Sequence, residues 1–544
     1  MLANCQLIPL FEQEHWEGLG SALGPSQQSP LLQNILAAVR AQGCNFALME
    51  SPYIDRDFSA SFSAFYASLF RPYSKLCKRV HFFRRDLSDL FAGPDPAAIP
   101  RRLEDCASDY LGYVVLRPLA HAPVSRAFLS QQLLAPEAAQ EVSVRCGEQV
   151  HLLGATIELA GFPLTQQDTR VGACAQASIW MAGRFFHLKH RAPWFSLPEI
   201  TSSALRPTDS AITRSLPAGS DYLTSDNMVR ALRAMGRHPV FYAPHTTSEG
   251  DQWGFDPKDV VAQYVDSGIP VILGLNDGHT VGHAVVAVGT KRRADVDIDA
   301  LPDRSSQAAF CSHFLIMDDQ RGAYLQLPIE GNPEAQIPFV LRDHLRFMIV
   351  PLPNKVFMTS EVAETIARGL IGNLAAQIDH LRAQLPEDKR EAWPPERAFY
   401  ERAVQGKLIA RTYLTYGWKY KSRAVRNHTS TTLKREVLKR DFPRYVWVTE
   451  FSFAEETRAI DPCARIVRAH VVTDATGSRF WESTLVIDSP GVVVTWDFNP
   501  KSDDATASQS LCLSDHSSIY FPKIRGAEGF EACVVAANAA AEEG

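Results

Sequence analysis

The amino-acid sequence predicts an α+β protein built from several domains. The chain has 544 residues, whereas single domains typically hold roughly 100–200. Its hydrophobic content of 46% and charged content of 21% are ordinary for a globular protein. Helical and strand-like patterns alternate in blocks. We expect an N-terminal α+β region over 1–155, a central domain over 156–355, and a C-terminal domain over 356–544, helical and then β-rich.

The N-terminal region combines two helical patterns with later strand-like runs. Apolar residues recur at helical spacing in 28–42, and aromatic residues do so in 58–70. Alternating or apolar runs follow at 110–117, 141–146 and 150–159, which predicts strands. We therefore expect helices packed on a sheet.

The C-terminal domain begins with helical patterns and ends with strands. Apolar positions three and four apart predict a long helix over 360–384, and 396–420 is also expected to be helical. From 445 onward the runs YVWVTEFSF, ARIVRAHVVTD, STLVIDS and GVVVTWDF predict strands.

Charge and composition exclude several classes of protein. The net charge is -6 with a pI of about 6.3, so nothing draws the whole protein to nucleic acid or an anionic membrane. The stretch 418–440 is basic, but a solvated helix face is favoured there over a nucleic-acid site. No apolar run approaches the roughly 18 residues of a membrane span, and no export signal is visible at the N-terminus.

The cysteines indicate a reducing compartment. Ten are scattered singly along the chain, which argues against a zinc site or a disulfide framework. We expect a cytoplasmic protein with reduced thiols, no membrane partner and no cofactor.

Cys174 stands where a polar loop runs into a helical pattern. The loop reads TQQDTRVGA, and the helical stretch CAQASIWMAGRFFHL follows it. Unpaired backbone N–H groups and the helix dipole favour an ionised thiolate at a helix start. A thiolate is the reactive nucleophile, so Cys174 is a candidate catalytic residue.

A histidine and two carboxylates follow at the ends of predicted strands. His283 opens the apolar run AVVAVG, and HFLIM ends in Asp318 and Asp319. Either carboxylate could accept the Nδ1–H of His283 and fix the ring's tautomer. His279 lies four residues before His283, but a metal site is not expected there because no third ligand is evident.

This order of residues resembles the papain-like cysteine peptidases, nearest the bacterial bacteriocin-processing peptidases that cleave double-glycine leaders. The resemblance covers roughly 160–330. It implies a helix bearing the cysteine packed on an antiparallel sheet, with Cys174 as nucleophile, His283 as base, and Asp318 or Asp319 as the orienting group. The family places an oxyanion-binding glutamine six residues before the cysteine, where this chain has Asp168. A loop longer by one residue would bring Gln167 into that role.

The resemblance implies a hydrolase that cleaves a peptide or amide bond of a peptide or protein substrate. A deamidase or an acyltransferase would use the same Cys-His pair, and a non-catalytic binding or sensor protein would keep the scaffold. The large flanking regions also suit a regulatory partner protein.

Overall fold

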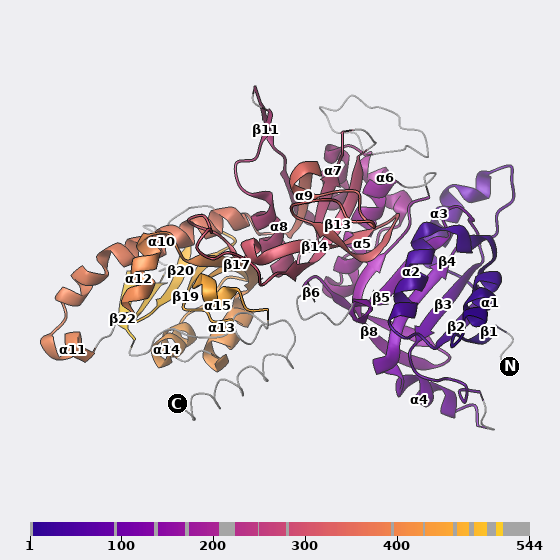
Figure 1. Cartoon of the computed structure of the whole chain (residues 1–544), viewed down its shortest axis with the longest axis horizontal. Helices are drawn as coiled ribbons and strands as arrows, with labels where there is room; N and C mark the ends of the chain where they lie inside the picture. The colour runs from indigo at the N-terminus through magenta and orange to yellow at the C-terminus, as the bar shows by residue number, and fades with distance from the viewer. Residues whose placement is uncertain are drawn as a thin grey trace. The chain divides into compact units, whose positions relative to one another are not determined.

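The computed structural model describes most of the chain (Figure 1). The described residues are 4–91, 95–134, 140–168, 173–205, 223–248, 250–278, 282–392, 396–427, 430–460, 465–477, 483–497 and 508–514. They form a mixed α and β protein with several sheets. The chain divides into two compact units. The first holds 1–244, 268–289 and 313–352, and the second holds the remaining residues. The domain limits expected at 155 and 355 stay a prediction.

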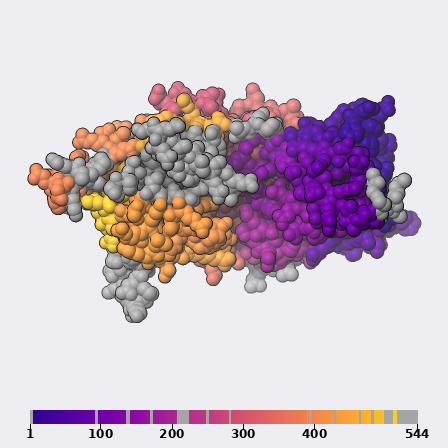
Figure 2. All heavy atoms as spheres, turned by 90° about the horizontal axis from the view of Figure 1, so that it is seen from below, coloured from indigo at the N-terminus to yellow at the C-terminus, as the bar shows by residue number. Residues whose placement is uncertain are grey.

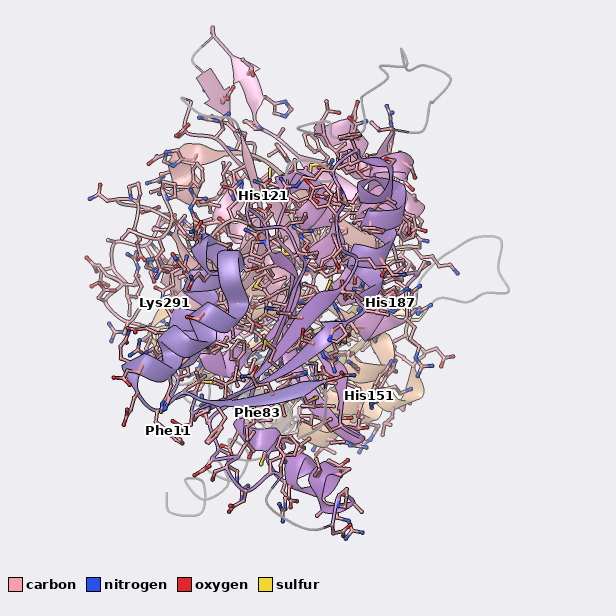
Figure 3. The ribbon with its side chains drawn as sticks, turned by 90° about the vertical axis from the view of Figure 1, so that its right-hand side faces the viewer. Phe11, Phe83, His121, His151, His187 and Lys291 are labelled. Atoms are coloured by element: carbon pink, nitrogen blue, oxygen red, sulfur yellow. The ribbon has the colours of Figure 1, made fainter. Side chains whose placement is uncertain are left out.

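The first sheet of the first unit is an antiparallel sheet of seven strands. Its order is β1 (Cys5–Pro9), β2 (Phe46–Tyr53), β3 (Cys77–Phe83), β4 (Tyr110–Leu116), β5 (Val124–Ser130), β8 (Ala155–Leu164) and β7 (Cys146–Leu152). Figure 3 labels Phe83, the last residue of β3, and Phe11. The Phe11 ring contacts the Phe46 ring edge-on, with 5.0 Å between ring centroids.

Helices α1 (Gln13–Leu23), α2 (Pro30–Ala41), α3 (Arg56–Ala64) and α4 (Ala98–Glu104) accompany this sheet. The helix expected over 28–42 is confirmed as α2, which starts after the capping hydroxyl of Ser29. In Figure 2 the indigo and purple atoms of this part of the chain form a continuous surface.

The strand expected over 150–159 is wrong, because the chain reverses within it. Leu152 pairs with Ala155 across a two-residue turn at Leu153 and Gly154, whose φ angles are 49° and 86°. A two-residue hairpin with positive φ at both positions matches the twist of the flanking strands. The alternation of apolar and polar residues continues through the turn, so the sequence pattern alone does not reveal the turn.

The second sheet of this unit lies later in the chain. Its order is β15 (Gly322–Pro328), β14 (Cys311–Asp318), β13 (His283–Arg292), β12 (Val271–Leu275), β16 (Leu345–Pro353) and β9 (Arg237–Tyr242), with the short β6 (Gln140–Val142) beside β13. The strands expected around AVVAVG and HFLIM are confirmed as β13 and β14. The Tyr324 hydroxyl donates to the Leu129 carbonyl at 2.8 Å and accepts the Phe162 N–H at 2.9 Å, which joins the two sheets.

The second unit holds an antiparallel sheet with helices on both faces. The sheet runs β17 (Ile409–Tyr416), β18 (Tyr445–Ser452), β19 (Ala469–Asp474), β20 (Thr484–Ser489), β21 (Val492–Asp497) and β22 (Ser508–Leu513). Helices α10 (Ser360–Ala383) and α12 (Arg397–Val404) share one core with it, and α13 (Gly417–Asn427) and α14 (Thr431–Lys439) share another. Burial on both faces explains the continuous apolar runs of these strands.

The helix expected over 396–420 is wrong in its second half. Helix α12 stops before Gly406, which has a φ of 71°, and β17 follows it. The β17 sequence IARTYLTY alternates between the two cores, with Ala410 in one and Tyr413 in the other. Because burial alternates from one residue to the next between two cores, this segment forms a strand and not a helix.

The basic stretch 418–440 covers the sheet with α13 and α14. Leu433 and Val437 are buried in the core under α14, and Glu436 pairs with both Lys439 and Arg440. These features are those of an amphipathic helix with a solvated basic face. Among the described residues, the structure has no helix with the length and apolarity needed to cross a bilayer.

Candidate active site

Cys174 is the first residue of α5 (Cys174–His190) and is half-buried. The helix start predicted from the sequence is therefore confirmed. Ala173 caps the helix, and its backbone N–H donates to the Gln176 side chain at 3.1 Å. Backbone N–H groups in the first turn of a helix have no partner within that helix, so they surround the thiol with partial positive charge.

Helix α5 is embedded in the first unit. Between Ala175 and Phe186 every residue except Arg184 is buried. The Phe185 ring stacks on Phe162 of β8 at 5.3 Å. The Ser178 hydroxyl, one turn after the cysteine, donates to the Ala284 carbonyl of β13 at 3.0 Å. This bond holds the thiol-bearing turn of α5 against the first residues of β13.

His283 opens β13 and is 7% exposed. It pairs with Leu275 across β12. Its Nε2 lies 3.0 Å from Oδ2 of Asp318. The Cys174 thiol, whose Sγ lies 3.9 Å from the Gly282 carbonyl oxygen, is near enough to the ring to affect its pKa. The Phe339 ring covers it, nearly parallel at 6.1 Å. The imidazole is thus fixed by a strand, a carboxylate and an aromatic ring, with the thiol within reach.

The ring nitrogen facing the carboxylate differs from the prediction, in which the Nδ1–H was donated to an aspartate. Nε2 lies beside Asp318, because this distal nitrogen is the one that reaches across to the end of β14. Nδ1 lies 3.5 Å from the Gln320 amide nitrogen instead. Asp319 is the more distant carboxylate, with Oδ1 3.9 Å from Nε2.

Asp318 ends β14 and is completely buried. It accepts the backbone N–H groups of Gln320 at 2.8 Å and Arg321 at 3.1 Å. Burial alone would raise the pKa of Asp318, but the charge and hydrogen bond of His283, together with the Gln320 N–H, lower it. The carboxylate is therefore ionised and oriented toward the ring.

The same pairing acts on the histidine. Burial alone would lower the pKa of His283, but the Asp318 charge and hydrogen bonds with Asp318 and Cys174 raise it well above its ordinary value. A raised pKa favours the imidazolium form. This charged ring lies beside the Cys174 side chain.

Asp319 is a second buried carboxylate at the same ring. Burial raises its pKa to about 7, with a further contribution from the negative charge of Asp318, although His283 opposes the shift. Neither oxygen has a hydrogen-bond partner of normal geometry among the described residues. Donor atoms of His283, Asp318 and Asp319 lie within 4.8 Å of one another, so these three could hold a metal ion.

Gln166, Gln167 and Asp168 have different surroundings. Gln166 is buried, accepting the Val124 N–H at 3.0 Å and donating to the Ser29 hydroxyl at 3.1 Å. Asp168 is also buried and accepts the Tyr66 hydroxyl at 2.9 Å. Gln167 is half-buried, and its backbone N–H contributes to the electrostatics of Asp319. The oxyanion role expected of Gln167 stays a prediction, whereas the Asp168 carboxylate is held within the fold by Tyr66.

Two contacts of the histidine were not foreseen from the sequence. Gln320 directly follows the two aspartates, so its place in the string DDQ was an available signal. Phe339 lies in a separate loop, and no local pattern marks it. His279 lies outside the described residues.

No family model matches the chain, and no curated protein matches it significantly.

Proposed function

We propose that this protein is a papain-like cysteine hydrolase that cleaves a peptide or amide bond with a Cys174–His283–Asp318 triad. The proposal is carried by one observation: a buried histidine lies 3.0 Å from a buried carboxylate and beside the half-buried thiol at the first turn of α5. Nucleophile, base and orienting group come from a helix and two strands, and the chemistry depends on their geometry and roles rather than on their order in the chain.

In the proposed reaction, His283 takes the proton of Cys174 and the thiolate attacks the carbonyl carbon. The oxyanion is held by the backbone N–H of Cys174 and the side-chain amide of Gln167. Removing one such donor costs about 3–4 kcal/mol of transition-state stabilisation in comparable sites. His283 then protonates the leaving amine, and a thioester with Cys174 remains. Water, deprotonated by His283, cleaves the thioester and restores the thiol.

The same steps serve a deamidase when the scissile amide belongs to a side chain, and an acyltransferase when an amine replaces water. The buried His283–Asp318 pair is required in each case. A peptide or protein substrate in the cytoplasm is our preferred assignment.

Alkylation with iodoacetamide, followed by peptide mapping, tests the nucleophile. Cys5 and Cys512 are matched controls because they are also half-buried. Cys44, Cys77 and Cys146 serve as slow references, since burial raises the pKa of each thiol to about 12. We expect Cys174 to react at least tenfold faster than Cys5 and Cys512 at pH 7. Equal rates for these three thiols would overturn the proposal.

Turnover is tested with a mixed fluorogenic peptide library. The wild-type protein should cleave members of the library, and Cys174→Ala should cleave none. Cleavage that survives Cys174→Ala would assign the activity to another group. Transfer of the acyl group from Cys174 to an added amine, which forms an amide and frees the thiol faster than hydrolysis does, would favour the acyltransferase.

A further inference from the structure

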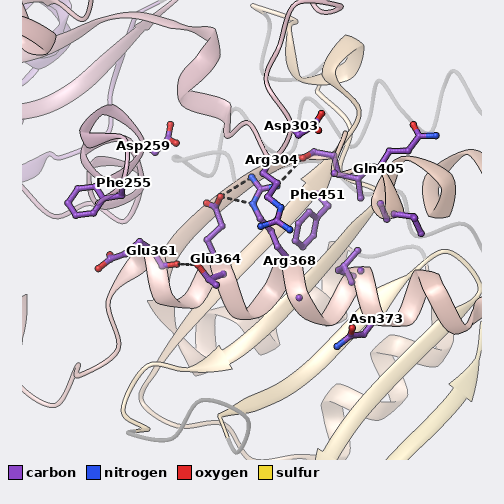
Figure 4. A pocket seen from close by; sticks show the side chains of 18 of the residues that line it. Phe255, Asp259, Asp303, Arg304, Glu361, Glu364, Arg368, Asn373, Gln405 and Phe451 are labelled. Atoms are coloured by element: carbon purple, nitrogen blue, oxygen red, sulfur yellow. Dashed lines mark hydrogen bonds and ion pairs between the residues drawn. The ribbon is translucent and has the colours of Figure 1, made fainter. Parts of the chain in front are cut away.

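A large pocket in the second unit has no part in the proposed reaction (Figure 4). Its volume is about 810 Å³, and it lies among α8 (Pro257–Asp266), α10 and the segments 303–304 and 403–408. Ligand sites typically have volumes of roughly 300–1,000 Å³. The pocket is therefore of the size that takes a small organic group or a short piece of peptide.

The pocket is bordered by two glycines in the middle of a helix. Gly369 and Gly372 belong to α10 and both line the pocket. A Cβ added at either would meet no atom within 4 Å, so packing does not require glycine there. Each is less favourable than alanine inside a helix. The apolar stripe Ala367, Ile371, Ala375 and Ile378 fills the core beneath α10. The glycines keep the backbone of α10 accessible from the pocket.

A buried hydrogen-bond acceptor also lines the pocket. Gln263 is 5% exposed, and its amide nitrogen donates to Glu364 at 2.7 Å. Its amide oxygen has no hydrogen-bond partner in the described part of the chain. An unmet buried acceptor is unfavourable. This oxygen is covered by protein, so a donor reaches it only when the Gln263 side chain turns toward the pocket.

Charged groups of both signs surround the pocket. Five carboxylates line it, against the guanidinium groups of Arg304 and Arg368, and two of the carboxylates, Asp256 and Asp303, are paired with Lys258 and Lys407. The Arg368 guanidinium group already binds Glu364 and the backbone carbonyls of Leu408 and Ser305.

Asp259 lines the pocket close to two other carboxylates, Asp256 and Glu364. It accepts the Ser306 hydroxyl at 2.7 Å. Burial raises its pKa to about 6, and the charges of Asp256 and Glu364 add to the shift, while the Ser306 bond and Lys258 oppose it. Phe255, Ile371 and Phe451 offer apolar surface in the same pocket. The walls thus combine negative charge, hydrogen-bond acceptors and surface for methylene groups.

We infer that this pocket binds a primary ammonium group carried on an aliphatic chain. Such a group donates up to three hydrogen bonds, pairs with Asp259, and lays its methylene groups along the apolar wall. Two sources offer this chemistry: the side chain of a lysine in a peptide, and a free diamine. The close approach to α10 at Gly369 and Gly372 suits a thin, unbranched chain.

Calorimetric titration of the full-length protein tests the inference. The probes are 1,5-diaminopentane, an acetylated and amidated lysine tripeptide, and 1,5-pentanediol as the neutral counterpart of the diamine. We expect one site for at least one amine and no binding of the diol. Tighter binding of the tripeptide assigns a peptide ligand, and tighter binding of the diamine assigns a free amine. Equal binding of diol and diamine, or no amine binding up to millimolar concentration, would overturn the inference.

Variants of the pocket separate binding from folding. Gly372→Ala should raise or preserve the melting temperature, because alanine favours the helix, yet weaken amine binding at least tenfold. Gly18→Ala is the matched control, since Gly18 also lies in a helix with nothing within 4 Å. Asp259→Asn should also weaken amine binding at least tenfold. Unchanged affinity in both pocket variants would contradict this site.

Discussion

His283 Nε2 lies 3.0 Å from Asp318 Oδ2, and both side chains are almost entirely inside the protein. Within this pair, two opposing effects act on the ring. Burial lowers the pKa of His283, whereas the Asp318 carboxylate raises it. The effect of the carboxylate is part of a net rise in this pKa. Asp318 therefore sets the protonation state of the imidazole as well as its orientation.

Replacing Asp318 with asparagine should remove the charge that favours the imidazolium. Burial then dominates, so the pKa of His283 falls. The alkaline limb of the rate of Cys174 alkylation should move to lower pH, and the rate at pH 7 should fall at least tenfold. Asp299→Asn, at an exposed carboxylate, is the control. An unshifted pH profile in Asp318→Asn would show that the carboxylate does not act on the ring.

Asp319→Asn should make the free energy of unfolding less dependent on pH. The folded pKa of Asp319 is about 7, above the ordinary value of 3.8. The protonated form therefore stabilises the fold, and that stabilisation is lost as pH rises from about 4 to about 7. At pH 8 the variant should exceed the wild type by on the order of 2–4 kcal/mol. Urea unfolding at pH 4 and pH 8 checks the prediction, and an equal difference at both pH values would contradict it.

Alanine substitutions at Gln166 and Gln167 should affect different properties, the stability of the fold and the catalytic rate respectively. Gln167→Ala should lower kcat by about 10²–10³-fold, with little change in melting temperature, because its proposed role is at the oxyanion. Gln166→Ala should destabilise the fold by about 1–3 kcal/mol, because it leaves the buried Val124 N–H without its acceptor. Peptide hydrolysis and thermal unfolding of both variants distinguish the roles. A reversed pattern would place the amide donor at Gln166.

Tyr324→Phe should weaken the junction of the two sheets in the first unit. The hydroxyl bonds both the Leu129 carbonyl and the Phe162 N–H inside the protein. Its loss should cost about 2–4 kcal/mol, because two buried backbone groups lose a partner. Tyr73→Phe, at a half-buried tyrosine, is the control. Equal urea midpoints for the two variants would refute this account.

Local patterns were sufficient to predict the elements of the candidate site. A loop-to-helix change of pattern placed Cys174 at the start of α5, and short apolar runs placed His283 and Asp318 at strand ends. These features depend on neighbours in the chain, so the sequence carries them directly.

The remaining details depend on tertiary contacts that no local pattern encodes. Which of Gln166, Gln167 and Asp168 enters the core depends on partners from distant segments, such as Ser29 and Tyr66. The ring nitrogen that meets Asp318 depends on how β14 lies beside β13. Strand β17 was predicted as helix because its pairing with β18 lies outside any local window.

The burial of α5 has a consequence for how such a protein diversifies. Its side chains are committed to neighbours over nearly the whole length between Ala175 and Phe186. Most substitutions in this helix would therefore disturb the packing around it. For the proposed hydrolase, a change of substrate preference is expected from residues outside α5 that approach Cys174.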